Sequence, residues 1–453
     1  MRKHNVLFYG WVVVAVAFLI SALGYGVRYS FSVIFTALLE QFKWPRDATA
    51  AILSFHILAY GFTAPIAGAL VDRFGARKTM ALGAVLLAAG AAASGLGNTL
   101  WHYYLSFGLL MGVGLCLMGG VPSTRIISNW FVTRRGLALS LMFFGSGGAF
   151  LLYPLVAFLI ERVGWRAAFV LEGVMVAAIL LPAVVFLVRS HPDEMGLLPD
   201  GARSASADAS ATKSYERAVV DKEWASRDWT LGKAVKEYRF WMLCLTTFSV
   251  WGIAEHIMVT HHVAFAEDAG YSKMYAASVL AFFGVFTSGG ALAGMVSDRI
   301  GREATFTIAT GIGISGIAVL MLMGDSSQPW ILYLYSILFG LGFGMTSPCI
   351  AASATDMFQG RRAGMVIGFI WFAFALGGAT GPWLGGAIFE ATGSYLPAFI
   401  LAACGFVVAC ISLWIAAPRK VRLVAGRARA RQKPGPTAEA GLPGADDDKP
   451  SVA

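Results

Sequence analysis

Arg28 lies in residues 11–35, an otherwise uncharged stretch that is long enough to cross a lipid bilayer. A bilayer core about 30 Å thick needs about 20 apolar residues in a helix, and Arg28 follows Trp11 by seventeen residues, roughly 25 Å. A guanidinium at that depth costs about 2.5 to 3.5 kcal/mol on insertion scales. We therefore expect Arg28, with Tyr25 one turn before it, to bind a small anion inside the protein. The alternative is that Arg28 only pairs with another buried residue.

A second set of ionisable side chains lies in the apolar stretch 240–266, which contains Glu255, His256, His261 and His262. Glu255 could contribute to the substrate site as the counter-ion of Arg28 in the empty protein. Alternatively, Glu255 or a histidine could carry a coupled proton, because burial favours a neutral carboxyl group and histidine titrates near neutral pH. A purely structural ion pair of Glu255, and histidines at the level of the outer lipid headgroups, are the simpler interpretations.

A third pattern combines carboxylates, arginines and glycines, and it occurs twice. Residues 68–78 read GALVDRFGARK, and residues 294–302 read GMVSDRIGR, 226 residues further on. A carboxylate at the end of a helix can face the positive N-terminus of another helix and pair with an arginine. We therefore expect Asp72 and Asp298 to hold one end of the molecule shut in one state, together with Gly68, Arg73, Gly75, Arg77, Gly294, Arg299, Gly301, Arg302, Arg134, Arg135, Arg361 and Arg362. Alternatively, these residues only anchor the loops at the inner membrane surface.

Three further residues are candidates for lining a substrate cavity: Arg125, Tyr335 and Trp371. Arg125 is also close enough to the inner interface for its side chain to reach water, and aromatic residues in membrane spans are more often packing residues. Glu172 is expected at the outer membrane boundary, and Asp356 with the arginine pair of the neighbouring loop.

The composition is that of a polytopic membrane protein. Hydrophobic residues make up 57% of the 453 residues and charged residues 13%, whereas a soluble globular chain carries about 25% charged residues. The five cysteines lack metal-binding or redox spacing, and the sequence shows no phosphate-binding loop and no nucleophile constellation. We therefore predict no enzyme, no catalytic or metal site and no cofactor. The net charge of +9 sits at the membrane boundaries and does not indicate nucleic-acid binding.

These residues require helices to position them, and hydropathy predicts an all-α protein with twelve membrane spans. The expected spans are 9–36, 49–70, 79–98, 102–127, 137–160, 167–188, 240–266, 275–296, 304–323, 330–353, 364–389 and 396–417. With the N-terminus inside, the short inner segments hold eleven Lys and Arg residues and the outer loops hold five. The positive-inside rule therefore places both termini in the cytoplasm, with the protein in the cell membrane.

Two internal repeats divide the chain into homologous halves. The doubled glycine–aspartate pattern has an offset of 226, and the loops FVTRRG (131–136) and FQGRRA (358–363) have an offset of 227. The predicted domains are therefore a six-helix half over 1–188, a cytoplasmic linker over 189–239, a second six-helix half over 240–417 and a disordered cytoplasmic tail over 418–453. We expect the linker to end in an amphipathic helix over 229–238. By offsets of 226–230, which align the halves, Arg28 maps onto residues 254–258, so it can lie at a depth similar to that of Glu255.

The doubled loop pattern resembles the signature of the major facilitator superfamily, and it covers both halves. Within that superfamily the chain is similar to the bacterial, monocarboxylate transporter-like branch. The resemblance rests on YGW (9–11), RYSFSV (28–33), WFVTRRGLA (130–138), GSGG (145–148) and HPDEMGLLPDG (191–201). It implies a fold in which spans 1, 4, 7 and 10 line a central cavity. It also favours His261 as a site residue, because this branch often has a histidine there.

The sequence departs from the family in span 8. Animal monocarboxylate carriers have an aspartate and an arginine within that span, whereas residues 276–296 contain no charge. The proton and substrate chemistry of that helix therefore cannot be transferred to this chain. Arg28 also lies near the lysine of the family's span 1, but not in perfect register with it.

The sequence as a whole predicts a secondary transporter that moves a small organic anion, such as a monocarboxylate, together with a proton by alternating access. It is expected to act as a monomer in the lipid bilayer. Two alternatives remain open at this point. One is proton-driven efflux of amphipathic or cationic compounds with Glu255 as the cation site, and the other is a non-transporting membrane sensor on the same fold.

Overall fold

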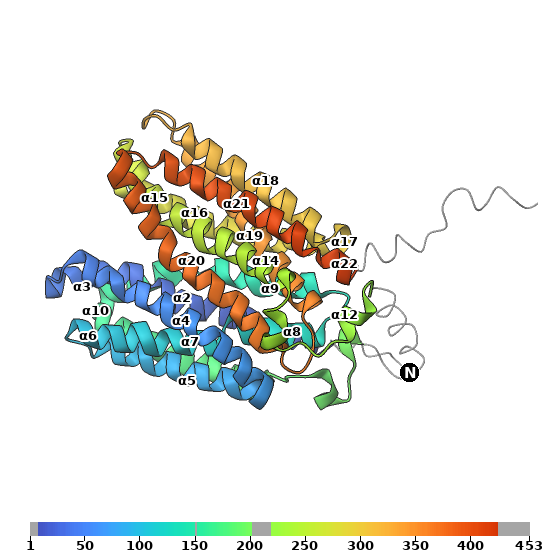
Figure 1. The fold of residues 1–453 in the computed structure, drawn as a ribbon. Coiled ribbons are helices and arrows are strands. Elements are labelled where there is room, and N and C mark those ends of the chain that lie inside the picture. The colour runs from blue at the N-terminus through green and yellow to red at the C-terminus, as the bar shows by residue number, and fades with distance from the viewer. Residues whose placement is uncertain (1–7, 150–151, 202–218, 425–453) are drawn as a thin grey trace, which may run out of the picture.

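The computed structural model describes residues 8–149, 152–201 and 219–424, so the predicted tail beyond residue 424 lies outside the described residues. The described chain is helical throughout (Figure 1), apart from loops and one isolated β-bridge between Val219 and Arg422. The elements of the first half are α1 (Gly10–Leu19), η1 (Ile20–Gly24), α2 (Tyr25–Tyr29), α3 (Phe31–Phe42), α4 (Arg46–Phe74), α5 (Ala76–Gly95), α6 (Leu100–Tyr103), η2 (Tyr104–Met111), α7 (Gly112–Met118), α8 (Gly120–Trp130), α9 (Arg135–Gly148), α10 (Leu152–Met175), η4 (Val176–Leu180) and η5 (Ala183–Leu187).

The described parts of the linker contain short helical elements, and the second half repeats the long helices of the first. The linker elements are η6 (Pro192–Met195), η7 (Pro199–Gly201), α12 (Lys222–Ser226) and α13 (Leu231–Ala234). The second half comprises α14 (Tyr238–Thr247), η8 (Phe248–Ala254), α15 (Glu255–Asp268), α16 (Lys273–Ala293), η9 (Gly294–Val296), α17 (Ser297–Ile300), α18 (Arg302–Met321), α19 (Trp330–Met357), α20 (Ala363–Thr392), α21 (Leu396–Ala416) and α22 (Pro418–Val421).

Ten segments among the described residues are long and apolar enough to cross a membrane. They coincide with ten of the predicted spans. Of the two other predicted spans, one overlaps α9 and the first part of α10, and the other coincides with α16. Spans 5 and 6 meet inside α10 at Gly164, where the backbone turns sharply at φ 79° and ψ 158°, a conformation that glycine adopts at low cost.

Spans 1 and 7 share a local irregularity just before their charged residues. Each contains a π-helical segment, η1 in span 1 and η8 in span 7, and η8 begins 228 residues after η1. This separation falls within the range that relates the two halves of the sequence. Arg28 follows η1 by four residues, and Glu255 follows η8 directly. π-Segments also occur in span 4 (η2) and in span 6 (η4 and η5), so the irregularity is not confined to the two spans that carry Arg28 and Glu255.

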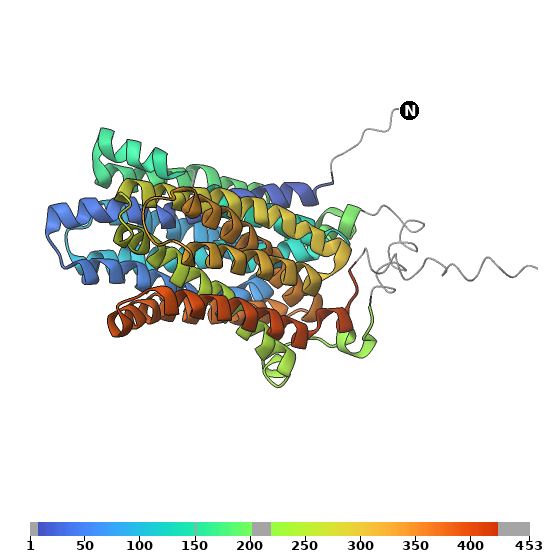
Figure 2. The same cartoon turned by 90° about the horizontal axis from the view of Figure 1, so that it is seen from above.

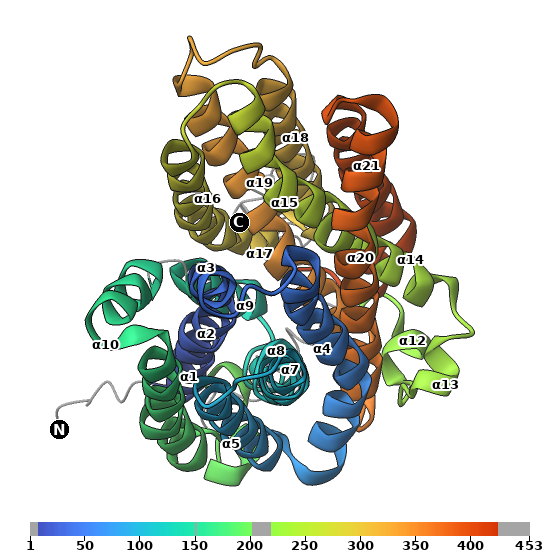
Figure 3. The same cartoon turned by 90° about the vertical axis from the view of Figure 1, so that its left-hand side faces the viewer.

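The helices of each half form a bundle, and the two bundles lie side by side when viewed along their length (Figure 3). Seen from above, most helices run along the long axis of the molecule, and the linker elements gather at one end (Figure 2). We call the end that carries α12, α13 and α22 the linker end, and the opposite one the far end. From the linker end to the far end, the two halves diverge (Figure 1).

Glycines set the contact between the halves, which follows α4 and α20 over the linker-end part of both helices. A β-carbon at Gly61 would lie 2.1 Å from Ala375 Cβ, and one at Gly68 would lie 2.0 Å from Gly364 O. Small residues at such positions let two backbones approach closely. Further along α20, Gly385 instead lies against His261 of its own half. The helix therefore leaves α4 on its way to the far end.

The linker does not form the single amphipathic helix that the sequence predicts over 229–238. Within that range the helical residues are α13 and Tyr238, the first residue of α14, and Glu237 between them is extended at φ −103° and ψ 128°. The indole Nε1 of Trp224, in α12, instead donates to Met357 O at 2.8 Å, and Trp229 N donates to Gln359 O at 3.1 Å. Both rings are buried, so their apolar faces pack against the loop after α19 and are not left for a membrane surface.

Candidate substrate site and gate

Arg28 is buried in α2, with an exposed fraction of 5%, and its Nε has no hydrogen-bond partner. The guanidinium carbon lies 5.6 Å from the centre of the Tyr29 ring. Among the described residues no carboxylate lies within the 4.0 Å of an ion pair with Arg28. Titratable side chains from both halves nevertheless interact with it electrostatically; they are Tyr25, His56, Tyr60, Glu255 and His256.

Glu255 approaches this region from the second half without contacting Arg28. Its side chain is 17% exposed, and one carboxylate oxygen lies 3.9 Å from His256 Nδ1. The same nitrogen donates to Trp251 O at 2.9 Å, which fixes the orientation of the His256 ring. A positive and a negative group therefore face one another across the two halves, with a separation greater than that of an ion pair.

Aromatic side chains from both halves surround the same region. The hydroxyl groups of Tyr25 and Tyr60 are hydrogen-bonded to each other at 3.1 Å. Trp371 packs against Trp251 with ring centres 5.1 Å apart and against Phe143 at 6.4 Å. The fit is tight, because a β-carbon at Gly120 of span 4 would lie 2.6 Å from the Trp371 ring. Trp371 therefore lies where both halves meet, as expected of a residue that lines a central site.

The other candidates of the second half are engaged in packing between its own helices. His261 Nε2 donates to Pro382 O at 2.9 Å, and the ring packs 5.2 Å from that of Tyr395. His262 Nδ1 donates to Met258 O at 3.0 Å, and its ring lies 5.9 Å from Tyr335. The geometry brings His256 toward Arg28, whereas these contacts place His261, His262 and Tyr335 among residues of the second half alone.

At the linker end, Asp72 caps a helix of the opposite half. Its two carboxylate oxygens accept hydrogen bonds from the first amides of α20, Gly364 N at 3.1 Å and Met365 N at 3.2 Å. Arg125 Nε lies 3.6 Å from the same carboxylate, and Arg125 Nη2 donates to Gly360 O at 2.6 Å. A negative charge at a helix N-terminus is stabilising, and this arrangement ties spans 2 and 4 to the start of span 11.

The second copy of the pattern has the same geometry with the halves exchanged. Asp298 accepts from Gly136 N at 3.1 Å and from Leu137 N at 3.0 Å, the first amides of α9. Its arginine partner is Arg302, whose Nη1 lies 2.8 Å from Asp298 Oδ1. The two carboxylates therefore bind the N-termini of spans 11 and 5, each across the boundary between the halves.

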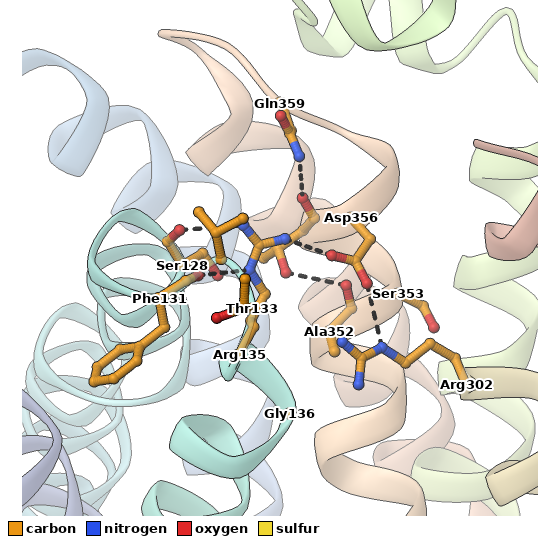
Figure 4. Close-up of polar contacts among 12 residues, drawn as sticks. Ser128, Phe131, Thr133, Arg135, Gly136, Arg302, Ala352, Ser353, Asp356 and Gln359 are labelled. Carbon is orange, nitrogen blue, oxygen red and sulfur yellow. Dashed lines mark hydrogen bonds and ion pairs between the residues drawn. The ribbon is translucent and has the colours of Figure 1, made fainter. Parts of the chain in front are cut away.

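Asp356 joins both halves in a buried ion triad (Figure 4). One of its oxygens binds Arg135 Nη1 of the first half, and the other lies 3.2 Å from Arg302 Nε of the second half. Arg135 also donates to Phe131 O and Ser128 O, both at 3.2 Å. All three charged residues of the triad are more than nine-tenths buried, so each depends on the others to satisfy its charge.

The remaining arginines of the predicted gate are exposed, and none is in an ion pair within the described ranges. They are Arg73, Arg77, Arg134, Arg299, Arg361 and Arg362. The glycines Gly75 and Gly301 lie at helix ends with φ of 84° and 105°, where a side chain would strain the turn. A β-carbon at Gly294 would lie 2.2 Å from Pro348 Cγ. The exposed arginines therefore fit the role of surface anchors, and the buried carboxylates and their partners hold the halves together.

Three residues lie elsewhere than the sequence suggested. Arg125 binds Asp72 and the loop at Gly360, so its place is in the linker-end contact. Asp356 was expected beside the arginine pair of the following loop, but it pairs with Arg135 and Arg302 because the helices bring those residues to it. Glu172 was expected at the outer boundary, yet its exposed fraction is 4%.

Comparisons with known proteins identify the family to which this chain belongs. The sequence matches the family described as Major Facilitator Superfamily over residues 16–382 and again over 289–442. The chain therefore belongs to the Major Facilitator Superfamily, a superfamily of membrane transporters. The proton:xylose symporter XylE, solved with a bound bromo-deoxyglucose, superposes with a TM-score of 0.71 at 17% identity, over 94% of this chain and 99% of XylE. Twelve spans in two homologous halves are thus the architecture of the protein.

Within the superfamily, the chain is similar to the monocarboxylate transporters. It is 28% identical to human monocarboxylate transporter 11 over 407 residues, 87% of this chain and 80% of the relative. To human monocarboxylate transporter 2 it is 24% identical over 417 residues, 90% of this chain and 84% of the relative. A Bacillus subtilis protein described as the uncharacterized MFS-type transporter YcxA is 28% identical over 402 residues, 87% of this chain and 91% of that protein.

Proposed function

We propose that this transporter moves a small organic anion, a monocarboxylate, together with a proton. The observation that carries the proposal is the state of Arg28, which is buried and has no ion-pair partner among the described residues. A buried cation without a partner is costly, and a carboxylate can satisfy it with a charge-assisted, bidentate pair. The similarity to proteins named monocarboxylate transporters supports the same class of substrate.

Glu255 supports the coupling to a proton. When an anion binds Arg28, a second negative charge nearby becomes unfavourable, and protonation of Glu255 removes it. His256, 3.9 Å from the Glu255 carboxylate, is the residue best placed to exchange that proton. His261 and His262 are weaker candidates, because their contacts lie among residues of the second half alone.

The arrangement of the halves fits alternating access. Asp72, Asp298 and Asp356 close the linker end, whereas the halves diverge toward the far end (Figure 1). We assign the linker end to the cytoplasm, because the short segments there carry most of the Lys and Arg residues. The structure then corresponds to an outward-facing state, and opening the inner gate requires the three carboxylates to release their partners across the halves.

Uptake into proteoliposomes tests the proposal. With a proton gradient directed into the vesicles (lower pH outside), the wild-type protein should accumulate a labelled monocarboxylate such as lactate, pyruvate or acetate. Arg28→Ala should reduce the initial rate at least a hundredfold, and Arg28→Lys should retain part of it, because lysine keeps the charge but not the bidentate geometry. Arg162→Ala is the matched control, since Arg162 is exposed in the same half. Wild-type rates in Arg28→Ala would refute the role of Arg28.

The same assay separates the proposal from efflux of cationic compounds. A cation site would depend on Glu255 and not on Arg28. If a lipophilic cation is still transported by Arg28→Ala but not by Glu255→Gln, the substrate is a cation and not an anion.

A further inference from the structure

Glu172 occupies an apolar position in span 6. Trp165, Phe169, Val176 and Leu180 are all buried and share one helical stripe with Glu172, at intervals of three or four residues. Trp165 marks the start of the span after the turn at Gly164, so Glu172 lies about 10 Å into it at 1.5 Å per residue. A carboxyl group thus stands where the helix otherwise buries large hydrophobic side chains.

Neither oxygen of the Glu172 carboxyl group has a hydrogen-bond partner, although the side chain is more than nine-tenths buried. Its polar neighbour is Ser30, at the junction of α2 and α3. The Ser30 hydroxyl donates its only proton to Val27 O at 2.8 Å, so it can accept a hydrogen bond from Glu172 but cannot donate one. While Ser30 donates to Val27 O, it offers no proton to an ionised Glu172, whereas the protonated acid could donate its O–H to Ser30 Oγ.

The elements packed against this part of α10 offer Glu172 no ion pair within 4.0 Å in the described part of the chain. Their charged or titratable residues, with those of α10 itself, are Tyr25, Arg28 and Tyr29 on α2, Glu40 on α3, Arg77 and Lys78 on α5, and Glu161, Arg162 and Arg166 on α10. A buried charge without a partner is unfavourable by several kcal/mol, so the neutral acid is the form that suits this position.

We propose that Glu172 is a second proton-binding site, whose protonated carboxyl group binds Ser30 and thereby holds span 1 with Arg28 in the position that binds the anion. Ser30 follows Arg28 by two residues on the same span. A hydrogen bond from Glu172 to Ser30 fixes the junction just beyond Arg28, and loss of the proton both breaks that bond and leaves a charge that must move toward water. The inference rests on the proposed function, because it assigns to Glu172 the role of positioning Arg28 in the same transport cycle.

Binding of lactate, or of whichever monocarboxylate the wild type transports, to the purified full-length protein at pH 6 and pH 8 tests the inference. The wild type should bind at least tenfold more weakly at pH 8. Because Glu255 also binds a proton in the proposed cycle, the comparison is made in a Glu255→Gln background: Glu255→Gln alone should keep part of the pH dependence, whereas Glu255→Gln combined with Glu172→Gln, which mimics the protonated acid, should bind within threefold at both pH values. Glu161→Gln, an exposed position on the same helix, should behave as the wild type.

Ser30→Ala provides a second variant that does not alter the carboxyl group. It removes the acceptor, so its affinity at pH 6 should fall at least fivefold. An unchanged pH dependence when Glu172→Gln is added to Glu255→Gln, or wild-type affinity in Ser30→Ala, would overturn the inference. Either result leaves the proposed function intact as long as Arg28→Ala abolishes binding, whereas binding that survives Arg28→Ala refutes the proposed function itself.

Discussion

At the scale of single residues, the charges buried in this protein fall into two groups. Asp356, Arg135 and Arg302 pair with one another at the linker end, and Arg302 also pairs with Asp298. Arg28 and Glu172 are buried to a similar degree but lack such partners in the described structure. The first group stabilises one arrangement of the halves. For the second group we propose two ligands, an anion that binds Arg28 and a proton that binds Glu172.

The ion triad gives a prediction at this scale. Asp356→Asn removes the negative charge that Arg135 and Arg302 share, and leaving a buried charge uncompensated costs about 3 to 5 kcal/mol. We expect a lower thermal unfolding temperature and faster labelling of a cysteine introduced at Ser128, because the linker end opens more often. Asp325→Asn, in an exposed loop, is the control. Wild-type stability and labelling in Asp356→Asn would show that the triad does not hold the gate.

At the scale of the elements, two helix N-termini and two glycine-lined contacts, α4 with α20 and α9 with α16, join the halves. Asp72 binds the start of α20 and Asp298 the start of α9, so the repeat of the sequence becomes a pair of equivalent contacts in space. The equivalence is incomplete. Asn129 stands in the first half where the 227-residue offset places the counterpart of Asp356, and it donates to Ser190 O of the linker instead. The buried ion triad is therefore confined to one side of the gate.

The close contact of α4 and α20 predicts the effect of a single methyl group. Gly68→Ala would place a β-carbon 2.0 Å from Gly364 O, so the helices must separate. Such overpacking costs about 1 to 3 kcal/mol and should lower the thermal unfolding temperature and the transport rate. Gly311→Ala is the matched control, because Gly311 lies in a helix where an added β-carbon would meet open space. This substitution should be neutral or slightly stabilising. Equal stability of the two variants would contradict the close contact.

The sequence predicts the spans and the two halves well, because long apolar segments and an internal repeat are local signals. It also identifies Asp72 and Asp298 as carboxylates facing helix N-termini of the other half, since the doubled pattern constrains both. The partners of Arg125 and Asp356 could not be predicted in this way, because they come from residues distant in sequence. The burial of Glu172 could have been predicted from the helical spacing of the large apolar residues from Trp165 to Leu180. Its nearness to the charged Arg166 instead suggested a place at the membrane boundary.

At the scale of the whole molecule, the contacts between the halves concentrate at the linker end. A transporter that works by rocking its halves must exchange these contacts for others at the far end. The substrate can drive that exchange only if it binds one arrangement better than the other. Arg28 and Glu255, which face each other from opposite halves, are placed to sense such a difference.

Spin-label distances across both ends test this movement. Labels at Asn98 and Ser326 report the far end, and labels at Arg77 and Arg299 report the linker end, with Cys404 and Cys410 replaced by serine. Without substrate the linker-end distances should be short and narrowly distributed. Monocarboxylate at pH 6 should add a longer linker-end population and a shorter far-end one. Distances that stay unchanged at both ends would argue against alternating access in this protein.

The central claim is that a carboxylate from the substrate satisfies the buried guanidinium of Arg28. Calorimetric binding of a carboxylic acid and of its uncharged amide to the purified protein tests it most directly. The account predicts that the wild type binds the acid at least a hundredfold more tightly than the amide, and that Arg28→Ala removes this preference. Equal affinity for acid and amide, or an unchanged preference in Arg28→Ala, would contradict it.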